Sequence, residues 1–323
     1  MRVLITGIEG FAAGHLTELL SAKPGMEVHG TFRDRGKAEL RLRRGSPIVL
    51  HEVDLREGRK VIRTIEDIAP EKIFHLAGRG YIPDSFADPL QTYETNVLGS
   101  VAVFEGARSL AQRYGRSPVV VHAGAGQAYD ALEGKMLRED DPFLPVNPYT
   151  ASKASADFIA RNYRSSFGLN IIATRPFNHV GPGQSDRFVC SEFAKRVAML
   201  SLQKEPWILE GGDIDIRRDF TDVRDVVRAY WLLSESESHH DAYNICSGTA
   251  VSIRQILDML RQISGIPVEY RLDPSRYRKN DVPLFIGSFA RLHEATGWKP
   301  EIPLFDTMRD MFTYWLHALR SAA

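Results

Sequence analysis

The stretch TGIEGFAAGHL at residues 6–16 decides the fold, because it follows the apolar run RVLITG and opens a segment of helical periodicity. Gly7 and Gly10 fall in the turn between the two, and Ala13 beside Gly14 fills a third small position. Glycine at such a turn lets the backbone approach a pyrophosphate, which the N–H groups and dipole of the helix N-terminus attract. This order of strand, glycine turn and helix predicts a dinucleotide-binding unit.

The rest of the first half alternates between short apolar runs and amphipathic segments. Strands are expected at 2–7, 27–32, 47–55, 72–78, 119–124 and 170–178, and helices at 11–22, 56–68, 89–115 and 149–167. Such alternation is typical of a parallel sheet that helices cover on both faces. The predicted fold class is therefore α/β, a Rossmann-type doubly wound parallel sheet with a smaller, discontinuous α/β substrate lobe.

The second half is irregular after residue 179, apart from an expected helix at 222–236 and a strand at 241–248. We expect these two elements to return to the sheet. The predicted dinucleotide-binding domain covers residues 1–178 plus about 214–247. The predicted second lobe covers about 179–213 and 248–323.

Composition narrows the class of protein further. The 323 residues contain 41 Lys+Arg and 41 Asp+Glu, and this charge balance argues against a nucleic-acid partner. Cys190 and Cys246 cannot form a disulfide framework and do not have metal-ligand spacing, so we expect no metal. The sequence has no apolar run of membrane-spanning length and no cleavable leader pattern. We expect a soluble cytoplasmic protein that does not bind a membrane.

The end of the second expected strand bears on the cofactor. NAD enzymes usually place an acid here for the ribose diol, whereas NADP enzymes place Arg near the 2′-phosphate. In the favoured register the acidic position is Phe32 and Arg33 follows it, which favours NADP. A shift of one residue would bring Asp34 to that position and favour NAD. Asp54 follows the third strand and either contacts the adenine or is an ordinary turn residue.

Tyr149 and Lys153 form a candidate catalytic pair. They are four residues apart, so they share one face of the expected helix. A neighbouring ammonium favours the phenolate, so we expect Lys153 to lower the pKa of Tyr149. The pair could then give a proton to a carbonyl oxygen as hydride reaches its carbon.

A family resemblance rests on these segments and on several in the second half. The turn at 6–16, HLAG (75–78), Asn96 and YTASK resemble the extended short-chain dehydrogenase/reductases that act on nucleotide sugars. Among these, GDP-4-keto-6-deoxy-D-mannose reductases, which make GDP-D-rhamnose, are the most similar. The similar segments are RPFNHVGPGQ (175–184), GDIDIRRDFTDVRDVVRAY (212–230), YNICSG (243–248), RYRKNDVP (276–283) and ATGWKPEIP (295–303).

The resemblance implies roles for particular residues. Tyr149 would be the acid, and Lys153 would tune it and hold the nicotinamide ribose. The implied cofactor-binding residues are Gly7, Gly10, Phe11, Arg33, Asp54, Leu55, Leu76, Ala77, Gly78, Asn96, Tyr149 and Lys153. The implied substrate-binding residues are Arg79, Tyr81, Asn178, Val189, Arg218 and Arg278. Arg218 and Arg278 would clamp the diphosphate of the sugar nucleotide, because guanidinium forks match phosphate oxygens. The alternative for each is a surface ion pair, with Asp219 for Arg218 or with Asp281 for Arg278.

The chain departs from the family pattern near the end of the fifth expected strand. The family has Ser or Thr where this chain has Ala125, and Glu or Asp where it has Gln127. The missing hydroxyl would bond the C4 oxygen of the sugar, and without acid or base groups at 125–127, 4,6-dehydration is disfavoured. The loop after HLAG also replaces a hydroxyl residue by Arg79, which either contacts an altered substrate with an anionic or bulkier substituent or caps the loop and points into solvent.

Three hypotheses about function follow. The first is an NADP-dependent reductase of a GDP-linked 4-keto-6-deoxy sugar, with NAD as the alternative cofactor. The second is a nucleotide-sugar epimerase that keeps its cofactor bound. The third is a nucleotide-sugar-binding protein that has lost its catalysis. The resemblance also implies a homodimer through the helices at 91–114 and 149–166.

Overall fold

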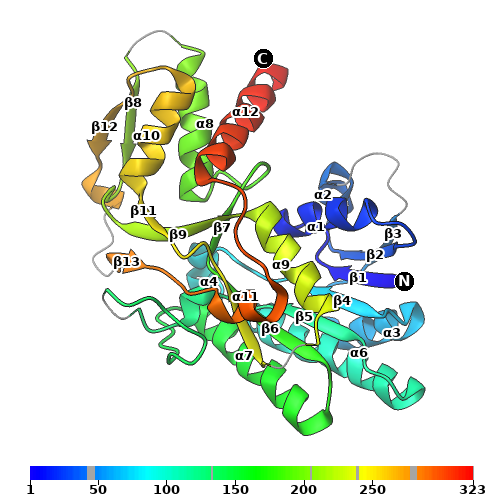
Figure 1. Ribbon diagram of the computed structural model, residues 1–323. Coiled ribbons are helices and arrows are strands. Elements are labelled where there is room, and N and C mark those ends of the chain that lie inside the picture. Colours follow the sequence, from blue (N-terminus) through cyan, green and yellow to red (C-terminus); the bar gives the residue numbers. More distant parts are fainter. Residues whose placement is uncertain (42–47, 132–133, 204–205, 238–239, 277–281, 323) are drawn as a thin grey trace.

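The computed structural model describes residues 1–41, 48–131, 134–203, 206–237, 240–276 and 282–322. A seven-stranded sheet forms its centre, and every neighbouring pair of strands is parallel (Figure 1). The strands lie in the order β10 (Ala242–Ile245), β6 (Ile171–Pro176), β5 (Val119–Ala123), β4 (Lys72–His75), β1 (Arg2–Thr6), β2 (Glu27–Phe32) and β3 (Ile48–Glu52). Chain order reverses between β1 and β4, the place where dinucleotides bind in such sheets. The predicted Rossmann-type fold class is confirmed.

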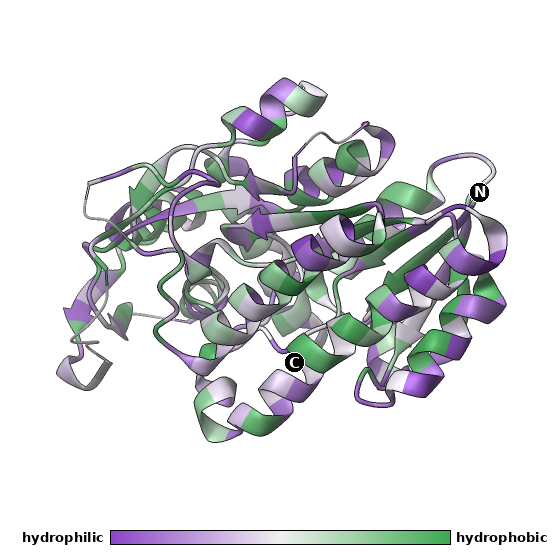
Figure 2. Cartoon of the chain, turned by 90° about the horizontal axis from the view of Figure 1, so that it is seen from below, coloured by the Kyte–Doolittle hydropathy of each residue, from purple (hydrophilic) through white to green (hydrophobic). Residues whose placement is uncertain are grey.

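Helices cover both faces of this sheet. One layer contains α1 (Phe11–Ser21), α9 (Val223–Glu235) and α11 (Ala290–Thr296), and the other contains α3 (Gly58–Ile68), α6 (Gly99–Tyr114) and α7 (Pro148–Phe167). Successive side chains of a strand point to opposite faces, so Val3 and Ile5 pack in the first layer and Leu4 packs in the second. Figure 2 shows the hydrophobic strands lying between helices that carry hydrophilic residues on their outer sides.

Shorter helices lie around the carboxyl edge of the sheet. These are α2 (Arg35–Arg41), α4 (Ile82–Ala87), α5 (Pro89–Tyr93) and the π-helical turn η1 (Glu94–Leu98), together with the 3₁₀ turn η2 (Gly126–Ala128). The continuous helix expected at 89–115 is therefore α5, η1 and α6 in succession. π-helical turns are frequent at functional sites, and this one contains Asn96.

The remaining elements form a second unit, above the sheet in Figure 1. Its small sheets contain β7 (Asn178–Val180), β9 (Arg217–Asp222), β11 (Ala250–Ser252) and β13 (Leu284–Phe285), and separately β8 (Ile208–Gly211) and β12 (Glu269–Leu272). Its helices are α8 (Val189–Ser201), α10 (Ile253–Ser264), the 3₁₀ turn η3 (Pro274–Arg276) and α12 (Leu304–Ala322). They enclose a separate hydrophobic core. β10 pairs with β6 and α9 packs on α1, but the domain boundaries themselves stay a prediction.

The start of α7 explains how the Tyr149–Lys153 pair is fixed. The Asn147 side chain accepts a hydrogen bond from the Thr150 amide (2.9 Å), and the Thr150 hydroxyl accepts one from the Asn147 amide (3.2 Å). This reciprocal cap, followed by Pro148 at the first helical position, sets where the helix begins. Tyr149 therefore lies in the first turn and Lys153 one turn later.

Candidate active site

The glycine turn after β1 forms one wall of the candidate site. Gly7 has a φ of 68°, and a Cβ there would lie 2.8 Å from the Ala77 Cα. The amide of Gly10 donates to the Gly7 carbonyl (2.9 Å), and Gly10 caps α1 without any side chain. A side chain at Gly7 would fill this cradle and strain the backbone. The turn therefore fits the pyrophosphate of a dinucleotide, as the sequence predicts.

The end of β4 forms the floor beside that turn. A Cβ on Gly78 would come within 3.0 Å of the Asn96 Oδ1 atom and 3.5 Å of the Lys153 Nζ atom. The Asn96 amide group binds the backbone of Arg79 from both sides, accepting from its N–H (2.8 Å) and donating to its carbonyl (3.1 Å). It also donates to the Ser152 hydroxyl (2.9 Å). Asn96 thus joins the β4 loop, with Leu76 and Ala77, to α7.

The ammonium group of Lys153 lies under this floor. It donates to the Ala123 carbonyl (2.7 Å), and Lys153 as a whole is 8% exposed. Burial lowers the pKa of Lys153 to about 8 and raises the pKa of the half-buried Tyr149 to about 12. The expected lowering of the Tyr149 pKa is therefore wrong. Burial removes solvent from the phenol and so raises its pKa, and no attraction from Lys153 offsets this effect.

The loop after β5 forms the opposite wall, where a hydroxyl is missing. Ala125 is 6% exposed and presents only a methyl group. Gln127 donates from Nε2 to the Asn178 Oδ1 atom (3.2 Å), and Asn178 donates to the Asp219 carbonyl (3.2 Å). The structure therefore brings Gln127 and Asn178 together, as expected of residues that share a site.

A buried polar network that sequence reasoning missed supports this wall. The Arg175 guanidinium forms two hydrogen bonds with Asp157 of α7 (2.8 and 2.9 Å) and donates to the Tyr129 hydroxyl (2.6 Å). The Tyr129 hydroxyl in turn donates to the Asn244 Oδ1 atom (2.7 Å). This network fixes the loop at 125–129 to the helix that carries Tyr149. The one local feature of the sequence that could have indicated this network is Arg175, the first residue of RPFN.

The loop after β4 reaches the second unit through Tyr81. The Arg187 guanidinium lies 3.7 Å from the centre of the Tyr81 ring and pairs with Asp84 (3.0 Å). Val189 begins α8 two residues later. The Nε atom of Arg79 is buried and has no hydrogen-bond partner among the described residues. Arg187 is a further contact that sequence reasoning missed.

Of the two arginines predicted to clamp the diphosphate, the structure describes Arg218. The Arg218 guanidinium donates to the carbonyls of Arg217 (2.9 Å) and Val282 (2.6 Å). Asp219, the alternative partner, accepts instead from the amides of Ser247 (2.7 Å) and Gly248 (3.0 Å). Arg278 lies outside the described residues.

The expected adenosine end contains Asp54 and Leu55, which follow β3. The Asp54 carboxylate binds the amide (3.0 Å) and the guanidinium of Arg56, which is the turn role that the sequence left open. The Leu55 side chain is 6% exposed and packs in the core. Arg33 is exposed after β2, and the Phe11 ring stacks on His179 at 6.0 Å.

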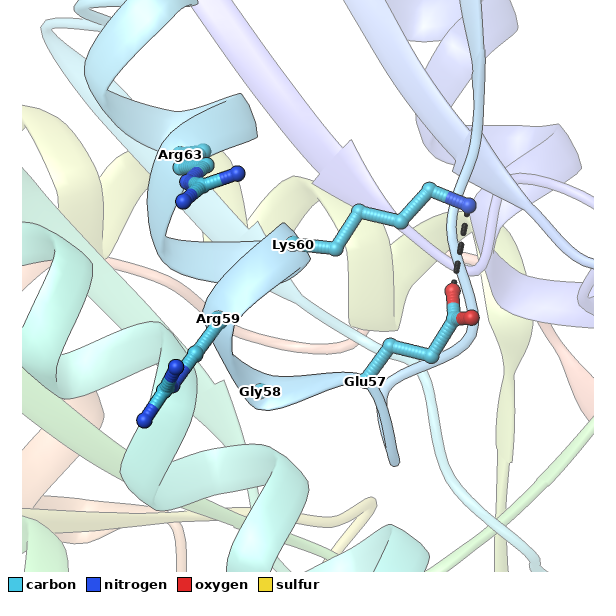
Figure 3. Close-up of a pocket in the computed structure, with 5 residues that line it drawn as sticks. All are labelled: Glu57, Gly58, Arg59, Lys60 and Arg63. Carbon is cyan, nitrogen blue, oxygen red and sulfur yellow. Dashed lines mark hydrogen bonds and ion pairs between the residues drawn. The ribbon is translucent and has the colours of Figure 1, made fainter.

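A separate surface hollow lies at the first turn of α3 (Figure 3). Its lining comes from one segment, Glu57, Gly58, Arg59, Lys60 and Arg63, and it contains an exposed ion pair between Lys60 and Glu57 (3.1 Å). None of these residues belongs to the predicted site. The site at the carboxyl edge of β1, β4 and β5 is therefore the candidate active site.

Comparison with known proteins agrees with this geometry. The family model for GDP-mannose 4,6 dehydratase matches residues 4–311. The chain belongs to this family. It is 32% identical over 321 residues to the GDP-6-deoxy-D-mannose reductase of Pseudomonas aeruginosa, covering 99% of this chain and 98% of that one.

Solved structures of similar proteins contain nicotinamide dinucleotides. RMD from Pseudomonas aeruginosa complexed with NADPH has a TM-score of 0.84 and 32% identity, covering 98% of this chain and 99% of that one. The UDP-glucose 4-epimerase of Thermus thermophilus, complexed with NAD, has a TM-score of 0.85 and 28% identity over the full length of both chains. The predicted membership of the nucleotide-sugar short-chain dehydrogenase/reductases is confirmed. So is the prediction of an NAD(P)-dependent enzyme, with NADP as the cofactor and NAD as the alternative.

Within the part of the chain that the structure describes, no helix combines the length and the apolar character that crossing a membrane requires.

Proposed function

We propose that this chain uses NADPH to reduce the C4 ketone of a GDP-linked 4-keto-6-deoxy sugar. One observation carries the proposal: Tyr149 and Lys153 are fixed at the cofactor floor, while residues 125–127 offer a methyl group, a glycine and an amide. Removal of water from a sugar needs an acid and a base in this loop, and reduction of a ketone does not. The similarity to a protein named as a reductase supports the same reaction.

The proposed proton donor is Tyr149. Bound NADPH would supply the hydride for C4 of the sugar. Tyr149 would give its hydroxyl proton to O4, so that the ketone becomes a secondary alcohol, and it would regain a proton from solvent. A pKa of about 12 keeps the phenol protonated at neutral pH. Lys153, with a pKa of about 8, stays largely charged there and would hold the nicotinamide ribose.

The proposed sugar-nucleotide contacts come from both units of the chain. Asn178 and its partner Gln127 would face the sugar, and Tyr81 and Val189 would flank it. Arg218, and Arg278 outside the described residues, would bind the diphosphate. Arg218 would exchange its carbonyl partners for phosphate oxygens, which are stronger acceptors for a guanidinium.

The decisive experiment gives the purified protein NADPH and GDP-4-keto-6-deoxymannose. We expect the absorbance of reduced nicotinamide to fall and the sugar to gain two hydrogens by mass spectrometry. The missing hydroxyl at Ala125 should cost about 1–3 kcal/mol in the transition state, roughly tenfold to a hundredfold in rate. If the protein does not oxidise NADPH with this sugar or with related keto sugars, the proposal fails.

Arg79 extends the proposal to the choice of sugar. A buried Nε atom without a partner among the described residues is costly unless a ligand satisfies it. We therefore propose that the preferred sugar carries an anionic group near this side chain. A panel of 4-keto sugars with and without a carboxylate should show a preference for the charged ones, and Arg79→Ala should remove that preference.

An epimerase is the second candidate, because the Thermus thermophilus epimerase covers the full chain with bound NAD. An epimerase would release no oxidised cofactor and would keep its dinucleotide through gel filtration. Net consumption of NADPH in proportion to the sugar reduced would exclude this candidate.

We also propose that two copies associate through the helices on one side of the sheet. Leu90 of α5 is 70% exposed, Leu98 of η1 is 61% exposed and Phe158 of α7 is 56% exposed, and these three elements pack together. Large apolar side chains gathered in one helical layer are typical of an interface between subunits. Light scattering should give twice the chain mass, and Phe158→Glu should reduce it to the chain mass. A cytoplasmic location, in which Cys190 and Cys246 stay reduced, belongs to the same proposal.

A further inference from the structure

The glycine turn contains a carboxylate that the predicted site did not include. Glu9 lies between Gly7 and Gly10, and its Oε2 atom accepts hydrogen bonds from the amides of Arg33 (2.9 Å) and Asp34 (2.9 Å). These are the first two residues after β2. Glu9 is only partly buried, so its carboxylate reaches the surface of the site. An acid is therefore fixed at the carboxyl end of β2, although it comes from the turn and not from the strand.

The position matters because the end of β2 is where dinucleotide enzymes distinguish NAD from NADP. An acid there binds the ribose diol, whereas cations and free N–H donors there bind the 2′-phosphate. In this chain the two backbone donors are already taken by Glu9. The negative charge of Glu9 would also repel a phosphate dianion.

The neighbouring acid, Asp34, is occupied elsewhere. Its carboxylate accepts from the Lys37 amide (3.2 Å) and pairs with the Lys37 ammonium (3.3 Å) at the start of α2. This contact lowers the pKa of Asp34, with the hydrogen bond from the Lys37 amide as the largest cause. Asp34 is therefore a helix-capping residue, and Glu9 is the acid that faces the end of the strand.

We propose that Glu9 is a specificity-determining residue that opposes Arg33 and keeps the chain from strongly preferring NADP over NAD. Arg33 attracts the 2′-phosphate, while Glu9 repels it, competes for its backbone donors and accepts from the ribose hydroxyls of NAD. The wild type then binds NADPH and NADH with dissociation constants within about tenfold of each other. Only the dinucleotide is involved, so a failure of this proposal and a failure of the proposed sugar reduction can be told apart.

The test measures binding of NADPH and NADH by nicotinamide fluorescence, without any sugar, in the wild type and in Glu9→Gln. Glutamine keeps an oxygen for the two amides but removes the charge. We expect the ratio of affinities to shift at least tenfold towards NADPH, and the shift to be larger at low salt because charge repulsion is screened by ions. Melting temperatures with NADP⁺ and NAD⁺ should shift in the same sense.

Two further variants separate specificity from support of the turn. Glu57→Gln removes an exposed carboxylate that pairs with Lys60 and should leave the ratio unchanged. Glu9→Ala should raise the ratio like Glu9→Gln, and it serves if the glutamine variant is unstable. If Glu9 only braces the turn, both Glu9 variants will melt earlier and lose the same factor in affinity for both dinucleotides. That result, or an unchanged ratio, would overturn the proposal.

Discussion

The cofactor side and the sugar side of this site are built differently. On the cofactor side, Asn96 holds the Arg79 backbone and Ser152, and Lys153 is fixed on the Ala123 carbonyl. On the sugar side, the Ala125 side chain offers no polar atom, and Gln127 donates to Asn178 at 3.2 Å. The proposed cofactor side is therefore tied together by hydrogen bonds between several elements, whereas the proposed sugar side lacks the side-chain hydroxyl that was expected at position 125.

The largest effect is expected from Tyr149→Phe, on the cofactor side. The variant keeps the ring but loses the only proton that the proposal assigns to O4. We expect kcat for ketone reduction to fall about a thousandfold, within the range of general acid catalysis. The dissociation constant for NADPH, measured by fluorescence, should change by less than about threefold, since α7 keeps its cap at Asn147. A rate within tenfold of the wild type would show that another group delivers the proton.

The next prediction concerns the network that joins the two sides. Arg175→Met leaves Asp157 as a buried carboxylate without its bidentate partner. Removing one member of such a buried pair costs about 3–5 kcal/mol, which denaturation by urea would measure. Arg161→Met is the control, because Arg161 pairs with the same carboxylate (3.1 Å) from a position that is one-third exposed. It should cost under about 1 kcal/mol, and equal losses would mean that the buried network is not the main support.

Lys153 gives the third prediction, which concerns pH. Its pKa is about 8 in the folded chain and 10.5 in the reference state, so the unfolded chain binds more protons between these values. The free energy of unfolding should therefore rise with pH in this window. We expect the difference between wild type and Lys153→Met to grow by about 2 kcal/mol in favour of the wild type from pH 8 to pH 10. A difference that stays flat or falls would contradict the low pKa.

The two sides also differ in how far the sequence could predict them. The glycine turn, the strands and the Tyr149–Lys153 spacing are local patterns, and the structure has them where they were expected. Asn96 was predicted too, but the π-helical turn that orients it was not, because no residue type marks such a turn. Most of the cofactor side could therefore be predicted from short segments of the sequence.

The contacts that could not be predicted join residues far apart in the chain. Tyr129 and Asn244, separated by 115 positions, meet only because β5 and β10 flank β6. The pKa of Tyr149 was predicted in the wrong direction because it depends on burial by the whole site and not on the spacing to Lys153. Glu9 was missed because its partners, Arg33 and Asp34, follow the next strand, 24 and 25 positions further along the chain.

The smallest expected effect comes from restoring the absent hydroxyl with Ala125→Ser. A serine there would bond the C4 oxygen of the sugar, and we expect the rate with GDP-4-keto-6-deoxymannose to rise about tenfold. Ala125→Cys is the matched control, because sulfur adds similar volume with a much weaker donor, and it should raise the rate by less than about twofold.

The local backbone offers that serine a competing partner. Ala125 has extended geometry and precedes the 3₁₀ turn η2, where a serine hydroxyl can accept from a backbone amide of the turn. If it does so, Ala125→Ser will gain stability in urea without gaining rate. A gain in rate with unchanged stability would instead place the hydroxyl on the sugar and show that the departure at Ala125 lowers activity towards this substrate. A loss of rate would mean that the methyl group itself fits the natural sugar, and that the sugar side has been rebuilt for a different substrate.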